Sequence, residues 1–569
     1  MVKQPKAENA DVSKHNLFAD LKSYIPILIF LAVMLSVYFN LGTSGIFESS
    51  EGRYASIARK MADTGDWLTP RLNDMKYFAK PPVTYWLGAL GIKIFGPNEF
   101  GVRFFLPIAA GLTALGTFYI GRLFFGTLVG VLSAMVLCTS MFFQLAFRGF
   151  TSDPFLTAAE TFMVLSFFLY LNHPQEKFKY LFWATVSLCF MIKGPPSLLP
   201  LPGLIIAGIY TDQKQALKNL FTFYKGILLF ILLGLGWYIL VSFQNPGLLK
   251  YFIFNETFLR VFSQAHSHSA PFYYFFALIP VAVFPWLGLF FASLTQQIEE
   301  FTDAPTSTYL LLWLAIPLLI FTFSQSKIPA YIMPLMVPIA ILTAEGIKRI
   351  FFEHNPIAVR NSRWHCIGVS AITALSGIIM SYWGYLNFNG AKKIGQMAIF
   401  GGIFWLFCSL IILAFILKAS RKGVLIIIAS IIPGFMLFVL PYIDGSEPYQ
   451  GNNRLPSQHV FLKQIAKALP ATQKLLFVDN TLKSWYFYTG KNAIACGIAA
   501  DDDYNGREIN SPDNFLNKKD TLQNIKPDTM LILLENNIPE IEKTIGKKLN
   551  VIIGDGEWKL AQTGSSRVN

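Results

Sequence analysis

Residues 23–41, SYIPILIFLAVMLSVYFNL, decide the fold class of this chain. They form an apolar run of about 19 residues, which as a helix spans the ~30 Å hydrocarbon core of a membrane. Polar, mixed-charge residues 1–22 precede the run, and no small-residue cleavage site follows it. We therefore predict an uncleaved first membrane helix rather than a signal peptide.

The composition extends this prediction to most of the chain. Of the 569 residues, 53% are hydrophobic and 14% are charged, whereas about 25% are charged in ordinary soluble domains. The net charge of +13 fits basic cytoplasmic loops that contact anionic membrane lipids, and we expect no nucleic-acid partner. Apolar runs typical of membrane helices recur about 13 times, at residues 23–41, 100–121, 127–147, 154–171, 180–193, 197–210, 226–243, 271–294, 309–325, 328–346, 365–388, 396–417 and 423–442.

The distribution of lysine and arginine predicts the orientation. With the N-terminus inside, the inside segments hold about 17 basic residues and the short outside loops about seven. The predicted organisation is a cytoplasmic segment 1–22, a membrane domain 23–443, and a tail 444–569 outside the membrane.

Two helices are expected in the first outside loop, residues 42–99. Tyr54, Ala58 and Met61 recur at helical spacing and predict an amphipathic helix over residues 50–64, with Ser50 as its N-cap and Gly65 as its stop. Residues 81–95 are apolar but too few to cross a membrane, which favours an interfacial helix.

A small α/β domain is predicted in the tail. Its expected strands are residues 475–478, 530–534 and 551–553, and residues 458–469 are expected to form a helix. The fold class is therefore an α-helical polytopic membrane protein with amphipathic juxtamembrane helices and a C-terminal α/β domain.

Two acids, Glu48 and Glu51, stand just outside the first predicted span. By themselves they could be solvated loop acids, or first-turn acids favoured by the helix dipole. The segment around them is more specific: it consists of residues 48–61 (ESSEGRYASIARKM), 65–73 (GDWLTPRLN), 77–82 (YFAKPP) and 85–87 (YWL).

These segments resemble the first periplasmic loop of the GT-C glycosyltransferases that use polyprenyl-phosphate sugars. Within them, the chain is most similar to the bacterial aminoarabinose transferases that modify lipid A, relatives of the protein O-mannosyltransferases. Further matching segments follow at 148–154 (RGFTSDP), 193–195 (KGP), 255–260 (NETFLR), 271–274 (PFYY) and 326–334 (SKIPAYIMP).

The resemblance implies a GT-C fold and an inverting transfer of sugar from undecaprenyl phosphate at the periplasmic face of the bacterial inner membrane. It implies catalytic roles for Glu51 and Asp153, with Glu48 as the alternate to Glu51. A departing phosphate needs preorganised donors, and the candidates are Lys80, Arg53, Lys193, Arg260, Lys327 and Tyr331. The alternatives are snorkelling or lipid-headgroup pairing for the bases, a Glu51 partner for Arg53, and an N-cap role for Asp153 before Pro154.

Two residues depart from the family pattern. Ser50 precedes Glu51 where an acid is common, and Ala79 precedes Lys80 where a glutamate is common. In some relatives of the resembled family that glutamate helps to hold a metal. We therefore expect no required cofactor. His266 and His268 remain candidates for a structural divalent metal, with solvated loop histidines as the alternative.

Three functions are compatible with these observations. The first is a lipid A 4-amino-4-deoxy-L-arabinosyltransferase-like enzyme, which implies a part in polymyxin resistance. The second is the same chemistry on a protein hydroxyl or another glycan. The third is a lipid-linked-sugar transporter, which predicts internal repeats and mid-membrane charges that we do not find in the sequence.

Overall fold

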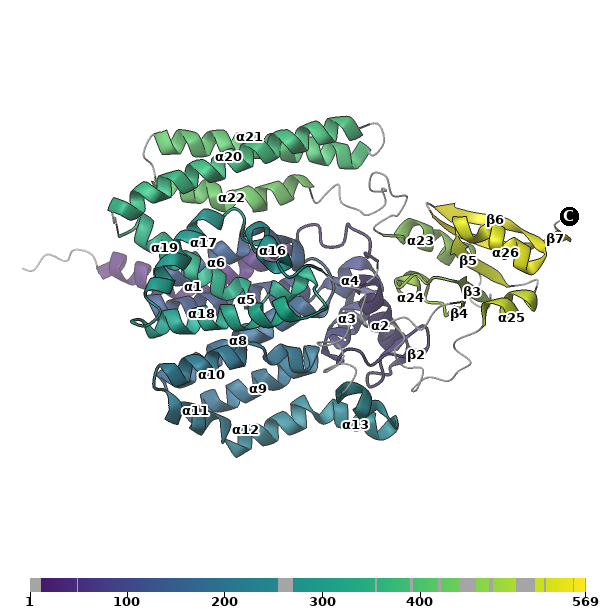
Figure 1. Cartoon of the computed structure of the whole chain (residues 1–569), viewed down its shortest axis with the longest axis horizontal. Coiled ribbons are helices and arrows are strands. Elements are labelled where there is room, and N and C mark those ends of the chain that lie inside the picture. The colour runs from purple at the N-terminus through teal and green to yellow at the C-terminus, as the bar shows by residue number, and fades with distance from the viewer. Residues whose placement is uncertain are drawn as a thin grey trace, which may run out of the picture.

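A helical bundle and a smaller α/β unit stand at opposite ends of the computed structural model (Figure 1). The short helices of the first loop lie between them. The structure describes residues 12–48, 50–253, 270–353, 356–388, 392–417, 421–439, 457–469, 474–497, 517–526, 529–555 and 557–567.

The first half of the bundle follows the predicted apolar runs. Its helices are α1 (Val12–Tyr38), α4 (Glu99–Arg103), α5 (Leu106–Phe125), α6 (Thr127–Cys138), α7 (Met141–Ala146), α8 (Ser152–Asn172), α9 (Glu176–Lys193), α10 (Pro200–Tyr210), α11 (Lys214–Phe221), α12 (Tyr224–Leu229), α13 (Gly236–Gln244) and α14 (Leu248–Lys250).

In the second half of the bundle, α20, α21 and α22 lie side by side along one edge (Figure 1). Its helices are α16 (Tyr274–Val283), α17 (Leu287–Glu299), α18 (Pro305–Phe323), α19 (Met336–Phe351), α20 (Pro356–Asn387), α21 (Lys392–Leu417) and α22 (Arg421–Val439).

Each predicted apolar run overlaps a helix. Among the described residues, five helices are long and apolar enough to cross a membrane, or seven if each of two bent pairs is one span. Several other apolar helices are shorter. The membrane class is thus confirmed, and the count of about 13 spans stays a prediction.

The predicted apolar run 271–294 is divided into two helices. There α16 and α17 meet at 116°. Pro285 has no N–H to donate and disfavours a helical conformation at Phe284, whose ψ is 134°. Residues 127–147 likewise form two helices, α6 and α7, instead of one.

The first loop contains both predicted helices, α2 (Ser50–Thr64) and α3 (Val83–Phe95). Tyr54, Ala58 and Met61 are buried, as the amphipathic pattern predicted. Ser50 is the first residue of α2, and Gly65 ends the helix with a φ of +73°, which glycine adopts without strain. A hairpin of β1 (Arg71–Leu72) and β2 (Met75–Lys76) separates the two helices.

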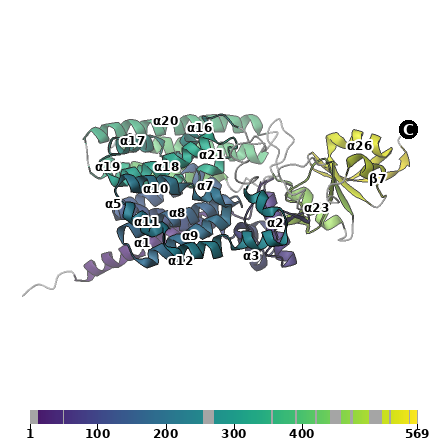
Figure 2. The same ribbon diagram turned by 60° about the horizontal axis from the view of Figure 1, so that its bottom comes forward.

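The polar side of α2 is also covered, because this helix lies between the bundle and the tail (Figure 2). Ser56 is 1% exposed and Lys60 is 7% exposed. Ser56 Oγ donates to the Lys483 carbonyl at 2.6 Å and accepts from the Phe487 N–H at 3.1 Å. The tail is therefore docked on α2 by specific polar contacts.

The tail is a five-stranded sheet with helices on both faces. The strand order is β4-β3-β5-β7-β6. Strand β3 pairs in parallel with both β4 and β5, whereas β7 pairs antiparallel with both β5 and β6. The predicted strands 475–478 and 530–534 are confirmed as β3 and β5, residues 551–553 lie in β6, and the predicted helix is α23. The elements are α23 (His459–Ala468), β3 (Leu475–Val478), α24 (Trp485–Thr489), β4 (Ile494–Cys496), α25 (Lys518–Gln523), β5 (Met530–Leu534), α26 (Ile538–Ile545), β6 (Lys547–Asp555) and β7 (Trp558–Arg567).

Candidate active site

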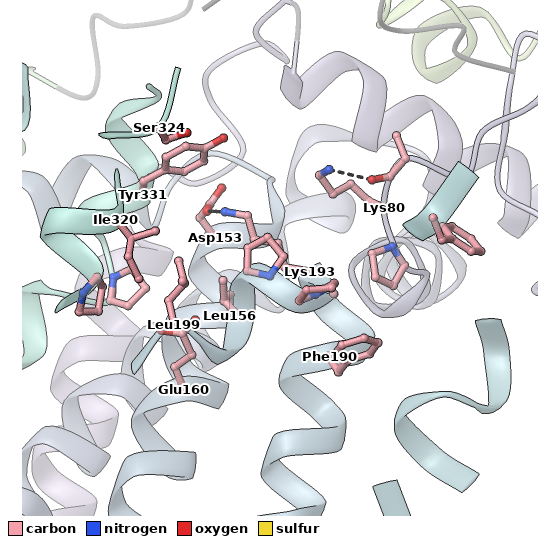
Figure 3. A pocket seen from close by; sticks show the side chains of 18 of the residues that line it. Lys80, Asp153, Leu156, Glu160, Phe190, Lys193, Leu199, Ile320, Ser324 and Tyr331 are labelled. Carbon is pink, nitrogen blue, oxygen red and sulfur yellow. Dashed lines mark hydrogen bonds and ion pairs between the residues drawn. The ribbon is translucent and has the colours of Figure 1, made fainter. Parts of the chain in front are cut away.

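A cavity of about 510 Å³ opens between the first loop and the ends of several bundle helices (Figure 3). Four residues predicted for the site line it together: Lys80, Asp153, Lys193 and Tyr331. They come from segments far apart in the sequence. Most of the remaining lining is apolar, so the cavity joins a charged rim to hydrophobic walls.

Asp153 lies in the first turn of α8. The helix begins at Ser152 with Thr151 as its N-cap, so Asp153 does not fill the N-cap position considered from the sequence. Its carboxylate is instead paired with the ammonium group of Lys193. The Asp153 side chain is 14% exposed and that of Lys193 is 12% exposed. The pair therefore faces the cavity from a largely buried position.

Lys193 is the last residue of α9. Gly194 ends the helix at a φ of +71°, and Pro195 begins a tight turn that cannot continue it. The Lys-Gly-Pro sequence thus places a lysine where a helix stops at the cavity. The Lys193 ammonium also lies 4.9 Å from the ring centre of Tyr331, within cation–π range.

Tyr331 is held in a short 3-10 turn, Pro329–Ile332. Its ring stacks on that of Phe321 in α18, with 5.1 Å between the ring centres and 28° between the planes. Phe321 also lines the cavity. This packing fixes the phenol opposite the Asp153–Lys193 pair, as Figure 3 shows.

Lys80 reaches the cavity from the loop that joins β2 to α3. Its Nζ donates to the Ala79 carbonyl at 2.7 Å. The start of this loop is anchored: the Tyr77 N–H donates to the Pro70 carbonyl at 2.8 Å, and the Phe78 ring packs against Trp237 of α13 with 6.1 Å between the ring centres. The position of Lys80 is therefore preorganised by the loop.

Glu51 does not line the cavity. Its carboxylate binds the Arg103 guanidinium through Nε at 2.7 Å and Nη2 at 2.8 Å. It also accepts from the backbone N–H of Phe47 at 2.9 Å and of Phe150 at 2.8 Å. These contacts favour a role in positioning for Glu51, because they occupy both of its oxygens.

Glu48 faces the tail instead of the cavity. Its carboxylate accepts from the backbone N–H groups of Lys483 at 2.9 Å and Ser484 at 3.1 Å, and from the Ser484 hydroxyl. Burial raises the pKa of the Glu48 carboxyl, and the hydrogen bonds from Ser484 and Lys483 oppose that shift. No local sequence pattern predicted this contact with the tail.

Two further candidates lie beside the site and not in its lining. Arg53 Nη2 is 3.4 Å from Ser50 Oγ, and the guanidinium is 5.8 Å from the ring centre of Tyr77. Lys327 donates to the carbonyl of Ser324, a cavity residue, at 2.6 Å.

Arg260, His266 and His268 lie outside the described residues. Within the part of the chain that the structure describes, no three His, Cys, Asp or Glu side chains are grouped as metal ligands. Ala79, beside Lys80, carries only a methyl group and offers no ligand atom. The described residues of this region therefore do not fit a metal site.

Two residues of this region escaped the sequence interpretation. Arg103 is fully buried against Glu51, and Glu160 is a buried acid in the cavity lining. Glu160 is a charge inside the predicted span 154–171, so the interpretation that the apolar runs contain no such charge was wrong. It follows Asp153 by seven residues and so lies on the same helix face.

Known proteins resemble this chain over most of its length. A family described as dolichyl-phosphate-mannose-protein mannosyltransferase matches residues 79–239. The undecaprenyl phosphate-α-4-amino-4-deoxy-L-arabinose arabinosyl transferase 2 of Proteus mirabilis is 29% identical over 394 residues, covering 67% of this chain and 71% of the relative. The enzyme of the same name from Pseudomonas fluorescens is 28% identical over 466 residues, covering 79% and 76%.

Solved structures share the fold. ArnT from Cupriavidus metallidurans bound to undecaprenyl phosphate superimposes with a TM-score of 0.78 at 22% identity, covering 95% of this chain and 98% of that one. The Archaeoglobus fulgidus oligosaccharyltransferase superimposes with a TM-score of 0.54 at 12% identity, covering 95% and 74%.

Proposed function

We propose that this chain, a GT-C glycosyltransferase of the superfamily that includes the aminoarabinose and protein mannosyl transferases, transfers an aminoarabinose-like sugar from undecaprenyl phosphate to lipid A. The observation that supports it most directly is the cavity that Lys80, Lys193, Asp153 and Tyr331 line together. Its charged rim suits a phosphate, and its apolar walls suit a polyprenyl chain.

The cationic rim performs the main chemical task. When the glycosidic bond breaks, negative charge accumulates on the departing undecaprenyl phosphate. The ammonium groups of Lys80 and Lys193 stabilise that charge, and the Tyr331 phenol donates a hydrogen bond to it. Because the loop, the Gly194 turn and the Phe321 stack fix these groups beforehand, little reorganisation accompanies the reaction.

The acceptor needs no strong base. A phosphate monoester of lipid A has a second pKa near ~6, so it is largely ionised at neutral pH and attacks the anomeric carbon directly. A single displacement inverts the anomeric configuration. Asp153 holds Lys193 in place, and that pairing aligns the donor phosphate for departure.

We place this reaction at the periplasmic face of the inner membrane. The lysine and arginine bias puts the first loop outside, and Lys80 of that loop lines the cavity. The tail contacts the same loop through Ser56 and Glu48, so it shares that side of the membrane. With the N-terminus in the cytoplasm, an odd number of spans, such as the 13 predicted, places the tail on the opposite side of the membrane.

The function is tested with the purified full-length chain, undecaprenyl-phosphate aminoarabinose and lipid A in detergent. We expect aminoarabinosyl-lipid A in the mass spectrum, and about 100-fold slower product formation by Asp153→Asn. Transfer in detergent also excludes pure transport. If purified enzyme leaves lipid A unmodified, and deletion leaves the lipid A spectrum of expressing cells unchanged, the proposal is wrong.

A protein acceptor is the second candidate, because the family that matches residues 79–239 is described as a protein mannosyltransferase. The same purified chain would then glycosylate serine or threonine hydroxyls of periplasmic proteins. Sugar on protein and none on lipid A would establish this alternative.

A further inference from the structure

Glu160 is a buried acid at the deep end of the cavity. It is 3% exposed and lines the cavity from α8, which also supplies Asp153. The seven residues between the two acids correspond to about 10 Å along the helix. Figure 3 shows Glu160 below the Asp153–Lys193 pair, beyond Leu156 and Leu199.

Among the residues that the structure describes, none donates a hydrogen bond to the Glu160 carboxyl or forms an ion pair with it within bonding distance. The other buried acids of the described residues are paired: Glu51 with Arg103, Glu99 with Lys463, and Glu345 with Arg349 and Gln297. A buried carboxyl without a partner costs several kcal/mol, and ionisable residues within membrane helices mark functional sites. Its neighbour Lys193 is paired with Asp153.

The two sides of the cavity suit different parts of the donor. On the α14 side, Leu249 is 58% exposed and Ile253 is 45% exposed, so this side presents apolar surface for a lipid chain. On the α8 and α18 side, Pro317 and Leu156 are buried, Ile320 is 37% exposed, and Glu160 is the acid that has no cationic partner at bonding distance among the described residues. A donor whose phosphate binds at the rim can therefore place its lipid chain on the α14 side and its sugar on the Glu160 side.

We propose that Glu160 binds the amino group of the donor sugar and thereby selects amino sugars over neutral ones. A carboxylate in apolar surroundings is stabilised most by a cationic hydrogen-bond donor, because an ammonium group neutralises its charge whereas a hydroxyl does not. Asp153 is less suited to this task, because Lys193 already compensates its charge. The inference rests on the proposed function and assigns its sugar specificity to one side chain.

The test compares two donors, undecaprenyl phosphate carrying 4-amino-4-deoxyarabinose or neutral arabinose, with the purified full-length wild type and Glu160→Gln. Glutamine keeps the volume and removes the charge. The ratio of kcat/KM for the amino donor to that for the neutral donor should fall about 10- to 100-fold in the variant. The matched control is Thr161→Val, a buried neighbour on α8 outside the cavity lining, and it should keep the wild-type ratio.

Equal losses on both donors, or an unchanged ratio, would overturn the assignment. Thermal stabilisation by each donor provides a readout that does not depend on turnover. The wild type should be stabilised more by the amino donor than by the neutral one, and Glu160→Gln equally by both. If the wild type binds both donors with this preference but transfers neither sugar, the proposed reaction is wrong while the role of Glu160 in binding stands. If both donors stabilise the wild type equally, the role proposed for Glu160 is wrong.

Discussion

Arg103 and Glu51 form a pair whose side chains are 0% and 4% exposed, with 2.7 Å between Nε and Oε1. The pair joins α4 to the start of α2, and Glu51 also accepts from the N–H of Phe150, three residues before Asp153. The remaining N–H groups of the Arg103 guanidinium donate to the backbone carbonyls of Leu41, Ser44 and Gly45, at the end of the first predicted span and the start of the first loop. The pair therefore fixes the frame from which Asp153 projects.

Glu51→Gln should lose activity together with stability. The variant leaves the Arg103 guanidinium buried without its counter-charge, which costs about 3–5 kcal/mol. Thermal unfolding in detergent micelles, measured beside the transfer rate, checks this. A double variant, Glu51→Gln with Arg103→Met, should regain part of the stability because it removes the buried charge. Loss of transfer with an unchanged unfolding temperature would contradict this positioning role and indicate a catalytic role for Glu51.

Asp153→Asn should lose activity and keep its stability. Lys193 would lose its carboxylate partner and its fixed position, and such misplacement lowers kcat about 100-fold. The unfolding temperature should change little because the pair borders an open cavity. Glu176→Gln is the matched control: it breaks the exposed Lys225–Glu176 pair and should leave kcat unchanged. A normal kcat in Asp153→Asn would contradict the assignment.

Lys80→Ala should weaken the use of the donor lipid. Loss of one charge-assisted contact to the phosphate corresponds to roughly a tenfold or larger decrease in kcat/KM for the donor. The control is Lys93→Ala in α3, whose ammonium lies 5.9 Å from the ring centre of Trp67 and outside the cavity lining. Steady-state kinetics with varied donor distinguish the two, and equal values for both variants would exclude Lys80 from phosphate binding.

Glu48→Ala should loosen the tail from α2. The substitution leaves the N–H groups of Lys483 and Ser484 without their acceptor, at about 1–3 kcal/mol for each buried donor. Hydrogen exchange at residues 482–490 should accelerate, while exchange in β3 and β5 stays slow. Glu535→Gln is the control. It removes the Glu535–Lys559 ion pair, which lies within the tail, and it should leave exchange at residues 482–490 unaltered.

The same carboxyl predicts a pH dependence. Because burial raises the pKa of Glu48 in the folded protein, the folded state binds its proton more readily than the unfolded state. The contribution of this group to stability therefore grows as pH falls through the raised pKa and declines as pH rises. We therefore compare the unfolding temperatures of the wild type and Glu48→Gln. The wild type minus variant difference should become larger as the pH is lowered from about 8 to about 5. A constant difference would contradict the raised pKa.

The sequence by itself determined the helical membrane class, the α2 and α3 helices of the first loop, and two strands of the tail. Each rests on a local cause: apolar length, 3.6-residue periodicity, or a short apolar run bounded by turns. Local sequence also placed Lys193, because Gly194 and Pro195 end α9 directly after it.

Only the tertiary structure decided what each charge contacts. Glu48, Glu51 and Asp153 are all acids near predicted helix starts, yet one binds the tail, one binds Arg103 and one binds Lys193. Glu160 shows the same limit, since its sequence neighbours indicate burial but not the cavity beside it. Helix periodicity fixes which residues share a face, whereas the partners of Asp153, Glu51 and Glu48 lie 40, 52 and 435 residues away in the sequence, which no local pattern encodes.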